Sequence, residues 1–226
     1  LLLYTNNQKQ ELLNAYGEKC KKENEIFVAP NSLYYRNDMM NVLSSKSTGV
    51  IYVGRLVSSK KVDVLIKAIP LVCKVEPSIV FHIVGDGEQS NELKKISRDL
   101  GIDENVMFYG HIADHSKLKE IYSKSFVSIS PGYVGLSITQ SLSFGVPMLV
   151  SKDENHSPEL EALQTGLNGG FFNTNDPQSL ADEILKYFHG RQYNMFDGEK
   201  IVNDCKHRYS VETMVDGVIE SVTQTR

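Results

Sequence analysis

The residues whose types and spacing could do chemistry lie in two stretches of the chain. In the first, GRLVSSKK, Arg55 and Lys60 place a guanidinium and an ammonium close together with no acid between them. The second, SPGYVGLSITQSLSFGVP from Ser130 to Pro147, has no charged residue, although 23% of the chain is charged. Two converging cations suit a diphosphate, and an uncharged stretch suits a ligand that brings its own charge.

Each stretch also has a simpler interpretation. Arg55 and Lys60 can be two solvated surface cations. In the second stretch, Gly132 and Gly135 permit tight backbone before a helix expected to start around Leu136 and Ser137, and the free N–H groups at such a start favour an anion. A buried crossover helix explains the missing charge equally well. The residues alone leave these alternatives open.

Other motifs predict less. GDGEQS imitates the dinucleotide fingerprint GxGxxG, but Ser90 stands at the last glycine, so a glycine turn with a capping Asp86 is the preferred interpretation. His111 and His115 have no third ligand near them, and they are predicted to be surface histidines rather than a metal site. No G-x-S-x-G elbow or D-x-D motif occurs, so neither a nucleophile nor a metal is predicted.

The composition excludes several classes of protein. A net charge of −4 over 226 residues argues against a nucleic-acid binder, and three distant cysteines without a CxxC suggest neither zinc nor a disulfide framework. A reducing, cytoplasmic setting fits this cysteine usage. The apolar start, Leu1–Tyr4, lacks the basic flank of a signal peptide. Because the first residue is not Met, we expect it to lie in an internal strand of a longer protein.

Short apolar runs alternate with amphipathic stretches through the middle of the chain, which predicts the elements that position these residues. Strands are expected at 50–54, 79–85, 105–110, 126–130, 147–151 and 169–172. Helices are expected at 62–75, 91–101, 115–125, 136–145, 157–166 and 176–190, followed by closing helices at 196–205 and 211–222. This alternation predicts an α/β fold with a doubly wound, parallel, six-stranded, Rossmann-like sheet, which binds ligands at the carboxyl ends of its strands.

Residues 1–48 do not join this alternation. The charged stretch KCKKENE breaks the pattern, and FVAPNS is typical of a strand followed by a turn. We therefore expect a boundary near residues 44–49 that divides the chain into three parts. These are 1–48, the remnant of an N-terminal domain with its linker; 49–190, the Rossmann-like domain; and 191–226, the C-terminal helices.

In combination, these motifs carry a family resemblance from Phe27 to Val222. The segments concerned are FVAPNS, YVGRLVSSKKVDVLIKA, HIVGDG, VMFYGHI, SPGYVGLSITQSLSFGVPMLV, GLNGGFF, DPQSLADEI and RYSVETMV. The chain resembles the family 4 retaining glycosyltransferases of the two-domain GT-B fold, specifically their C-terminal, nucleotide-sugar-binding half. The stretch PGYVGL is similar to that of bacterial polysaccharide-assembly members.

The resemblance implies a role for each matching position. Arg55 and Lys60 would hold the donor diphosphate and act as the catalytic cations. The turn that would meet the phosphates and the sugar through backbone amides consists of Gly135, Leu136 and Ser137. The backbone of Ile112 would contact the base, and Lys117 would add a further basic contact. No metal is implied.

The sequence departs from the family pattern at two positions. The family carries E-x7-E here, with one Glu on the donor hexose and the other on the ribose, but this chain has Gly132 and Gln140. Gln140 keeps a carbonyl acceptor for the ribose, whereas Gly132 offers only backbone to the hexose.

The resemblance further implies transfer of a sugar from a UDP- or GDP-sugar to a glycan or lipid-linked acceptor, with the nucleotide sugar as substrate and no other cofactor. The acceptor would bind on a missing N-terminal domain, so the fragment alone is expected to be inactive. Membrane association at the inner face is open only for the full-length protein, and no nucleic-acid partner is expected. The alternatives are a non-catalytic nucleotide-binding module and a GT-B-fold nucleotide-sugar epimerase.

Overall fold

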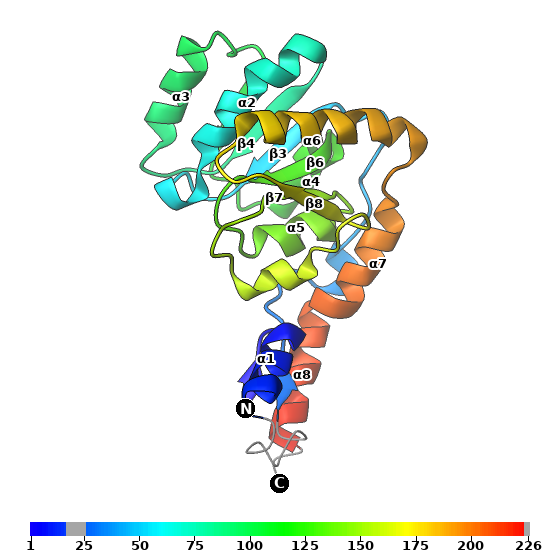
Figure 1. The fold of residues 1–226 in the computed structure, drawn as a ribbon. Helices are drawn as coiled ribbons and strands as arrows, with labels where there is room; N and C mark the ends of the chain where they lie inside the picture. The colour runs from blue at the N-terminus through cyan, green and yellow to red at the C-terminus, as the bar shows by residue number, and fades with distance from the viewer. Residues whose placement is uncertain (17–25, 224–226) are drawn as a thin grey trace.

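The computed structural model describes residues 1–16 and 26–223, which form a large α/β unit and a smaller unit (Figure 1). The large unit contains a six-stranded sheet in the order β5-β4-β3-β6-β7-β8, and every neighbouring pair is parallel. Counted from β3, this is the 3-2-1-4-5-6 order of the Rossmann fold. The predicted fold class is therefore confirmed.

The strands of this sheet lie close to their predicted positions. They are β3 (Gly49–Val53), β4 (Val80–Val84), β5 (Val106–Gly110), β6 (Ser125–Ser130), β7 (Met148–Ser151) and β8 (Gly169–Phe172). Every residue of β6 and β7 is buried, because helices cover both faces of the sheet. In the uncharged stretch between these strands, Val134, Ile138, Leu142, Phe144 and Val146 are also buried, so part of this stretch is core, as the simpler interpretation held.

Helices cover the two faces in separate layers. One face packs against α2 (Val62–Val75), α3 (Ser90–Asp99) and α6 (Pro177–Gly190), which share a single hydrophobic cluster with the sheet. The other face carries α4 (His115–Ser123), α5 (Ser137–Ser143) and α7 (Gly198–Tyr209). Figure 1 shows the first layer above the sheet and the second below it.

The helix predicted at 157–166 is wrong in extent. The chain forms only a short 3-10 helix, Pro158–Ala162, before it turns into β8. The Asn168 side chain donates to the Ala162 carbonyl at 2.9 Å and accepts from the Gln164 N–H at 2.7 Å. These two hydrogen bonds occupy backbone groups that a continuing helix would need, which is why the helix ends there.

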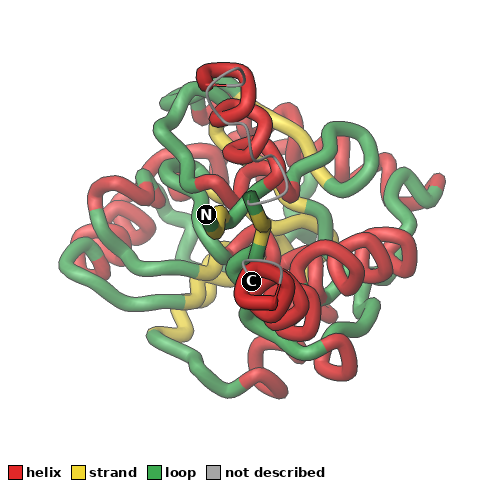
Figure 2. The backbone as a smooth tube through the Cα atoms, turned by 90° about the horizontal axis from the view of Figure 1, so that it is seen from below, coloured by secondary structure: helices red, strands yellow, loops and turns green. Residues whose placement is uncertain are grey.

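The smaller unit joins segments from both ends of the chain. The apolar start forms β1 (Leu2–Leu3), which pairs in parallel with β2 (Phe27–Val28), and α1 (Asn6–Tyr16) and α8 (Val211–Thr223) pack around this pair. In Figure 2, seen from below, the start of β1 lies near the last turns of α8.

The KCKKENE stretch lies outside the described residues, and the boundary predicted near 44–49 stays a prediction. None of the described helices has the length and apolar character to span a membrane.

One glycine turn couples the sheet to the loop that follows β3. Gly85 has φ +144°, and a Cβ placed on it would lie 1.8 Å from the Gly54 carbonyl oxygen. Gly54 also donates to the Val84 carbonyl at 3.0 Å, so the two strand ends touch through backbone. The positive φ angles of Gly85 and Gly87 fit the predicted glycine turn, but the capping role predicted for Asp86 is wrong. Asp86 Oδ1 accepts from the Gly87 N–H at 2.7 Å, whereas α3 has Gln89 as its N-cap and no side-chain cap.

We expect Gly85→Ala to lower the free energy of unfolding by about 3 kcal/mol, because a backbone clash adds to the cost of positive φ. Gly101→Ala is the matched control, since Gly101 has φ +67° but a Cβ there meets nothing within 4 Å. The control is expected to cost about 1 kcal/mol. Equal losses in urea denaturation would contradict the close contact.

Candidate functional site

A cleft opens at the carboxyl ends of β3 and β6, where the strand order reverses and Rossmann-like sheets bind their ligands. It consists of two adjoining cavities of about 540 Å³ and 320 Å³. The larger is lined by Leu33, Val53, Gly54, Arg55, Val57, Ser59, Lys60, Tyr133, Gly135, Leu136, Ser137 and Gln140. The smaller shares Val53, Gly54, Arg55 and Gln140 and adds Val84, Gly85, Asp86, His111 and Ile112.

The loop after β3 presents both predicted cations to this cleft. Its backbone is fixed next to Arg55, whose carbonyl accepts from the Tyr52 hydroxyl at 2.8 Å, while the Leu56 N–H donates to the Asp86 carbonyl at 2.9 Å. A short 3-10 helix, Ser58–Lys60, then turns the chain so that Lys60 faces the same cavity. The exposed guanidinium of Arg55 and the half-buried ammonium of Lys60 therefore converge on one volume.

In the described part of the chain, neither cation is neutralised by an acid. Among residues 1–16 and 26–223, no carboxylate forms an ion pair with Arg55 or Lys60, although the adjacent Lys61 pairs with Glu154. Burial lowers the pKa of Lys60, and the nearby Arg55 charge lowers it further. The ammonium instead donates to the Tyr133 carbonyl at 2.8 Å and lies 4.7 Å from the centre of the Tyr133 ring. Two uncompensated positive charges favour an anionic ligand here.

The loop after β6 is joined to the loop after β3 by backbone. The Tyr133 N–H donates to the Ser59 carbonyl at 3.0 Å. A Cβ on Gly132 would lie 2.4 Å from the same carbonyl oxygen, so only glycine fits. Gly132 is buried in this contact and does not line the cleft, so its predicted contact with the hexose stays a prediction.

The start of α5 provides donors at the cleft wall. Gly135, Leu136 and Ser137 all line the larger cavity, and the first turn has no acidic residue and no side-chain cap. Within the described residues, the N–H groups of Leu136 and Ser137 have no protein acceptor. The residues that carry these unpaired amides line the same cavity as the two cations, and both kinds of group favour an oxyanion.

Gln140 lies where the two cavities meet, and a residue that the sequence did not single out orients it. Its Nε2 donates to the Tyr34 hydroxyl at 2.8 Å. The Tyr34 ring packs edge-on against His115, with centroids 4.7 Å apart, and against Phe144 at 5.9 Å. With Nε2 engaged, the Gln140 carbonyl oxygen is left to accept hydrogen bonds.

The smaller cavity holds Ile112 as expected but not Lys117. Lys117 lies in the first turn of α4, where its N–H donates to the Asp114 carboxylate at 3.0 Å, and its contact with a ligand stays a prediction. The surface position predicted for His115 holds only in part, because its half-buried ring packs against both Tyr34 and Phe144. The sequence prediction also missed Asp86 and His111 as lining residues. In the described part of the chain, no three His, Cys, Asp or Glu residues are grouped as a metal site would require.

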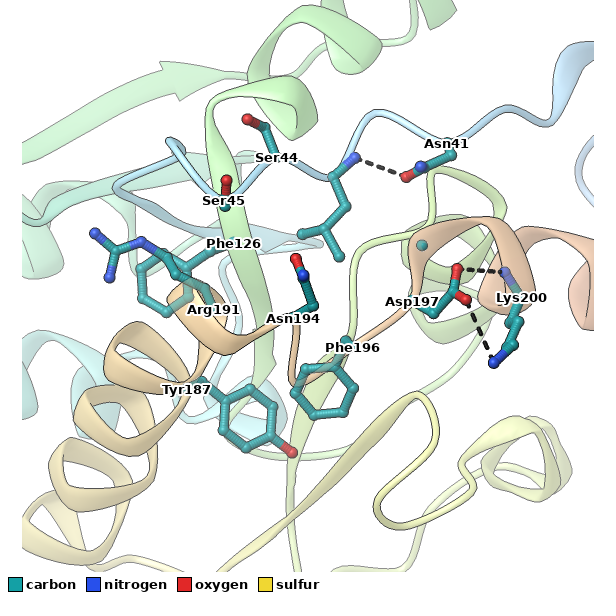
Figure 3. Close-up of a pocket in the computed structure, with 12 residues that line it drawn as sticks. Asn41, Ser44, Ser45, Phe126, Tyr187, Arg191, Asn194, Phe196, Asp197 and Lys200 are labelled. Atoms are coloured by element: carbon teal, nitrogen blue, oxygen red, sulfur yellow. Dashed lines mark hydrogen bonds and ion pairs between the residues drawn. The ribbon is translucent and has the colours of Figure 1, made fainter.

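A separate cavity of about 480 Å³ lies near the amino end of β6 (Figure 3). It also contains two cations, but one of them, Lys200, pairs with an acid, Asp197, at 3.5 Å. Arg191, like Lys60, contacts a carbonyl and an aromatic ring: its guanidinium lies 3.3 Å from the centre of the Phe188 ring and donates to the Phe188 carbonyl. Among the described residues, two cations without an acid partner thus distinguish the cleft at the carboxyl ends.

The strand order and the position of the cleft define a Rossmann-like α/β domain. The family described as "Glycosyl transferases group 1" matches residues 37–199, and the chain belongs to this family. It corresponds to the C-terminal half of the GT-B fold, as the resemblance implied.

Curated relatives are consistent with this assignment. Poly(ribitol-phosphate) alpha-N-acetylglucosaminyltransferase of Staphylococcus aureus is 23% identical over 96% of this chain and 42% of its own length. An uncharacterized glycosyltransferase of Haemophilus influenzae is 30% identical over 76% of this chain and 46% of its own length. The chain thus spans less than half of these relatives.

Solved structures share the fold. A mutant of S. aureus TarM in complex with Fondaparinux, alpha-GlcNAc-glycerol and UDP superposes with a TM-score of 0.77 at 21% identity, covering 98% of this chain and 43% of TarM. Anabaena HepE in complex with UDP gives 0.74 at 19% identity, covering 98% of this chain and 63% of HepE.

We expect Tyr34→Phe to lower the free energy of unfolding by about 1 kcal/mol, because the half-buried Gln140 amide loses its acceptor while the ring contacts remain. Tyr35→Phe is the matched control, since Tyr35 is 59% exposed. The control is expected to stay within about 0.5 kcal/mol of wild type. Identical denaturation curves for the two variants would show that the Tyr34–Gln140 hydrogen bond contributes nothing.

Proposed function

We propose that this chain is the donor-binding half of a retaining glycosyltransferase that transfers a sugar from a UDP- or GDP-sugar to a glycan or lipid-linked acceptor. The observation that carries the proposal is that Arg55, Lys60 and the unpaired amides of Leu136 and Ser137 line one cavity. This cavity combines two cations with backbone donors and has no acid of its own. A diphosphate is the group of a nucleotide sugar that matches it.

In this reaction, negative charge develops on the leaving nucleoside diphosphate as the glycosyl–phosphate bond breaks. Arg55, Lys60 and the two amides would stabilise that charge more strongly in the transition state than in the ground state. By analogy with oxyanion holes, loss of one such contact lowers the rate by roughly 10²–10³-fold. The proposed mechanism assigns no general base to this half.

We assign different parts of the donor to the two cavities. We assign the diphosphate to the larger cavity, the ribose to Gln140 at the junction, and the base to the smaller cavity beside Ile112. Relatives of the same fold were crystallised with UDP, which supports a uridine nucleotide as the first ligand to test. The acceptor is assigned to a part of a longer protein outside this chain.

We expect Arg55→Gln and Lys60→Met each to weaken UDP binding by about 10- to 100-fold in isothermal titration calorimetry, because each removes a charge-assisted contact. Arg55→Gln should leave the free energy of unfolding unchanged or slightly higher, since it relieves repulsion from Lys60. Lys67→Gln is the control, because Lys67 pairs with Asp63 on the exposed side of α2. The proposal fails if wild type shows no saturable binding of UDP, GDP or their sugars, or if both variants bind like wild type.

A second function, a non-catalytic nucleotide-binding module, is favoured by the absence of glutamate at 132 and 140. Wild type and Gln140→Glu, each in the longer protein that we propose contains this chain, discriminate between the two in a donor-release assay. Transfer by wild type is the expected result. Transfer or donor hydrolysis only by Gln140→Glu would indicate a module that has lost catalysis.

A further inference from the structure

A histidine after β7 holds the loop that carries the cleft amides. His156 Nδ1 lies 3.1 Å from the Val134 nitrogen, and His156 Nε2 lies 2.7 Å from the Ser151 carbonyl oxygen at the end of β7. The next residue, Ser157, donates its N–H to the Val134 carbonyl at 3.1 Å. Both backbone polar groups of Val134 therefore bond to the same short segment.

These contacts define which nitrogen of the His156 imidazole carries a proton. The Val134 N–H can only donate, so Nδ1 must accept through its lone pair. The Ser151 carbonyl can only accept, so Nε2 must carry the proton. His156 therefore bridges the loop after β6 to the end of β7 as a neutral, Nε2-protonated imidazole.

The same peptide group connects His156 to Lys60. The Val134 N–H belongs to the peptide whose carbonyl is that of Tyr133, and this carbonyl accepts from Lys60 Nζ at 2.8 Å. His156 and Lys60 thus bond to the two polar ends of one peptide plane. A rotation of this plane would displace both the ammonium and the turn that follows.

Hydrogen bonds set the orientation of the turn, and the later peptides have their own: the Val134 carbonyl accepts from the Ser157 N–H at 3.1 Å and the Gly135 carbonyl from the Ile138 N–H at 3.2 Å. The Val134 side chain is fully buried and fixes the position of its Cα, but Gly135 has no side chain, and a Cβ there would touch only Tyr133 and Ser157 atoms at 3.7 and 3.8 Å. The peptide planes before Leu136 therefore depend on hydrogen bonds for their orientation.

We infer that His156 is a positioning residue for diphosphate binding: its imidazole orients the 133–134 peptide, and through the carbonyl of this peptide it orients Lys60. This inference rests on the proposed function, because the ligand is the same diphosphate. His156 does not line the cleft and acts through Val134.

Two substitutions test the roles of the two ring nitrogens separately. In His156→Asn the side-chain oxygen can take the place of Nδ1 and accept from the Val134 N–H, but nothing reaches Ser151. In His156→Gln the side-chain amide nitrogen can take the place of Nε2 and donate to the Ser151 carbonyl, but no acceptor remains for the Val134 N–H. Each variant keeps one half of the bridge, so any general effect on packing is shared between them.

The experiment is calorimetric titration of UDP into wild type, His156→Asn and His156→Gln of the full 226-residue chain, with thermal unfolding of each without ligand. We expect UDP affinity to fall about tenfold in His156→Gln and by no more than about threefold in His156→Asn, at similar melting temperatures. Equal UDP affinity in the two variants overturns the inference but not the proposed function. Absence of UDP binding by wild type overturns both.

If neither variant folds, NMR spectroscopy of the wild-type chain still tests the inference. The imidazole ¹⁵N spectrum is expected to show a protonated Nε2 and an unprotonated Nδ1, and the Val134 amide resonance should move when UDP is added. A proton on Nδ1, or a Val134 amide that does not respond to bound UDP, overturns the inference.

Discussion

The cleft depends on one backbone contact between two loops that are distant in sequence. β3 and β6 are neighbours in the sheet, so the loops that follow them emerge at the same edge. The Tyr133 N–H and the Ser59 carbonyl join these loops at 3.0 Å, and Gly132 allows their backbones to touch. Because of this contact, the cations of one loop and the amides of the other share a single cavity.

The positive charge of the cleft depends on Lys60, which has no acid partner among the described residues. Glu154 pairs with Lys61 rather than with Lys60. Lys60 donates instead to the Tyr133 carbonyl, which supplies a dipole but no negative charge. Burial and Arg55 both lower the pKa of Lys60, so its charged form is disfavoured until an anion binds. A bound anion would favour the charged form of Lys60 and so offset these two effects.

Much of the fold and part of the cleft could be predicted from the sequence. The periodicity of apolar residues predicted the positions of all six strands of the large sheet, and α2 begins and ends at the predicted residues. The rule that ligands bind at the carboxyl ends of parallel strands then predicted that Arg55, Lys60 and the start of α5 would lie together. The structure brings them to one cavity, while their contact with a ligand stays a prediction.

The features that could not be predicted depend on contacts between segments that share no periodic pattern. Tyr34 reaches Gln140 from the linker before β3, and His156 reaches Val134 from the loop after β7. Asn168 shortens the helix before β8 by two side-chain hydrogen bonds, whereas local propensity favoured a longer one. In each case a single polar side chain decides the geometry, and its partner is known only once the strands are ordered.

The open side of the cleft bears on where catalysis would take place. Arg55 is exposed, and Leu33 and Tyr133 are 41% and 39% exposed at the rim, so water reaches the cations in this chain. Interactions with charge strengthen as water is excluded, since the effective dielectric constant falls from that of water toward that of the protein interior. Water therefore weakens the attraction between these cations and an anion, and this attraction would strengthen if a further wall closed over the cleft. The alignments cover 42% and 46% of the two relatives, so each relative contains a further part that this chain does not match.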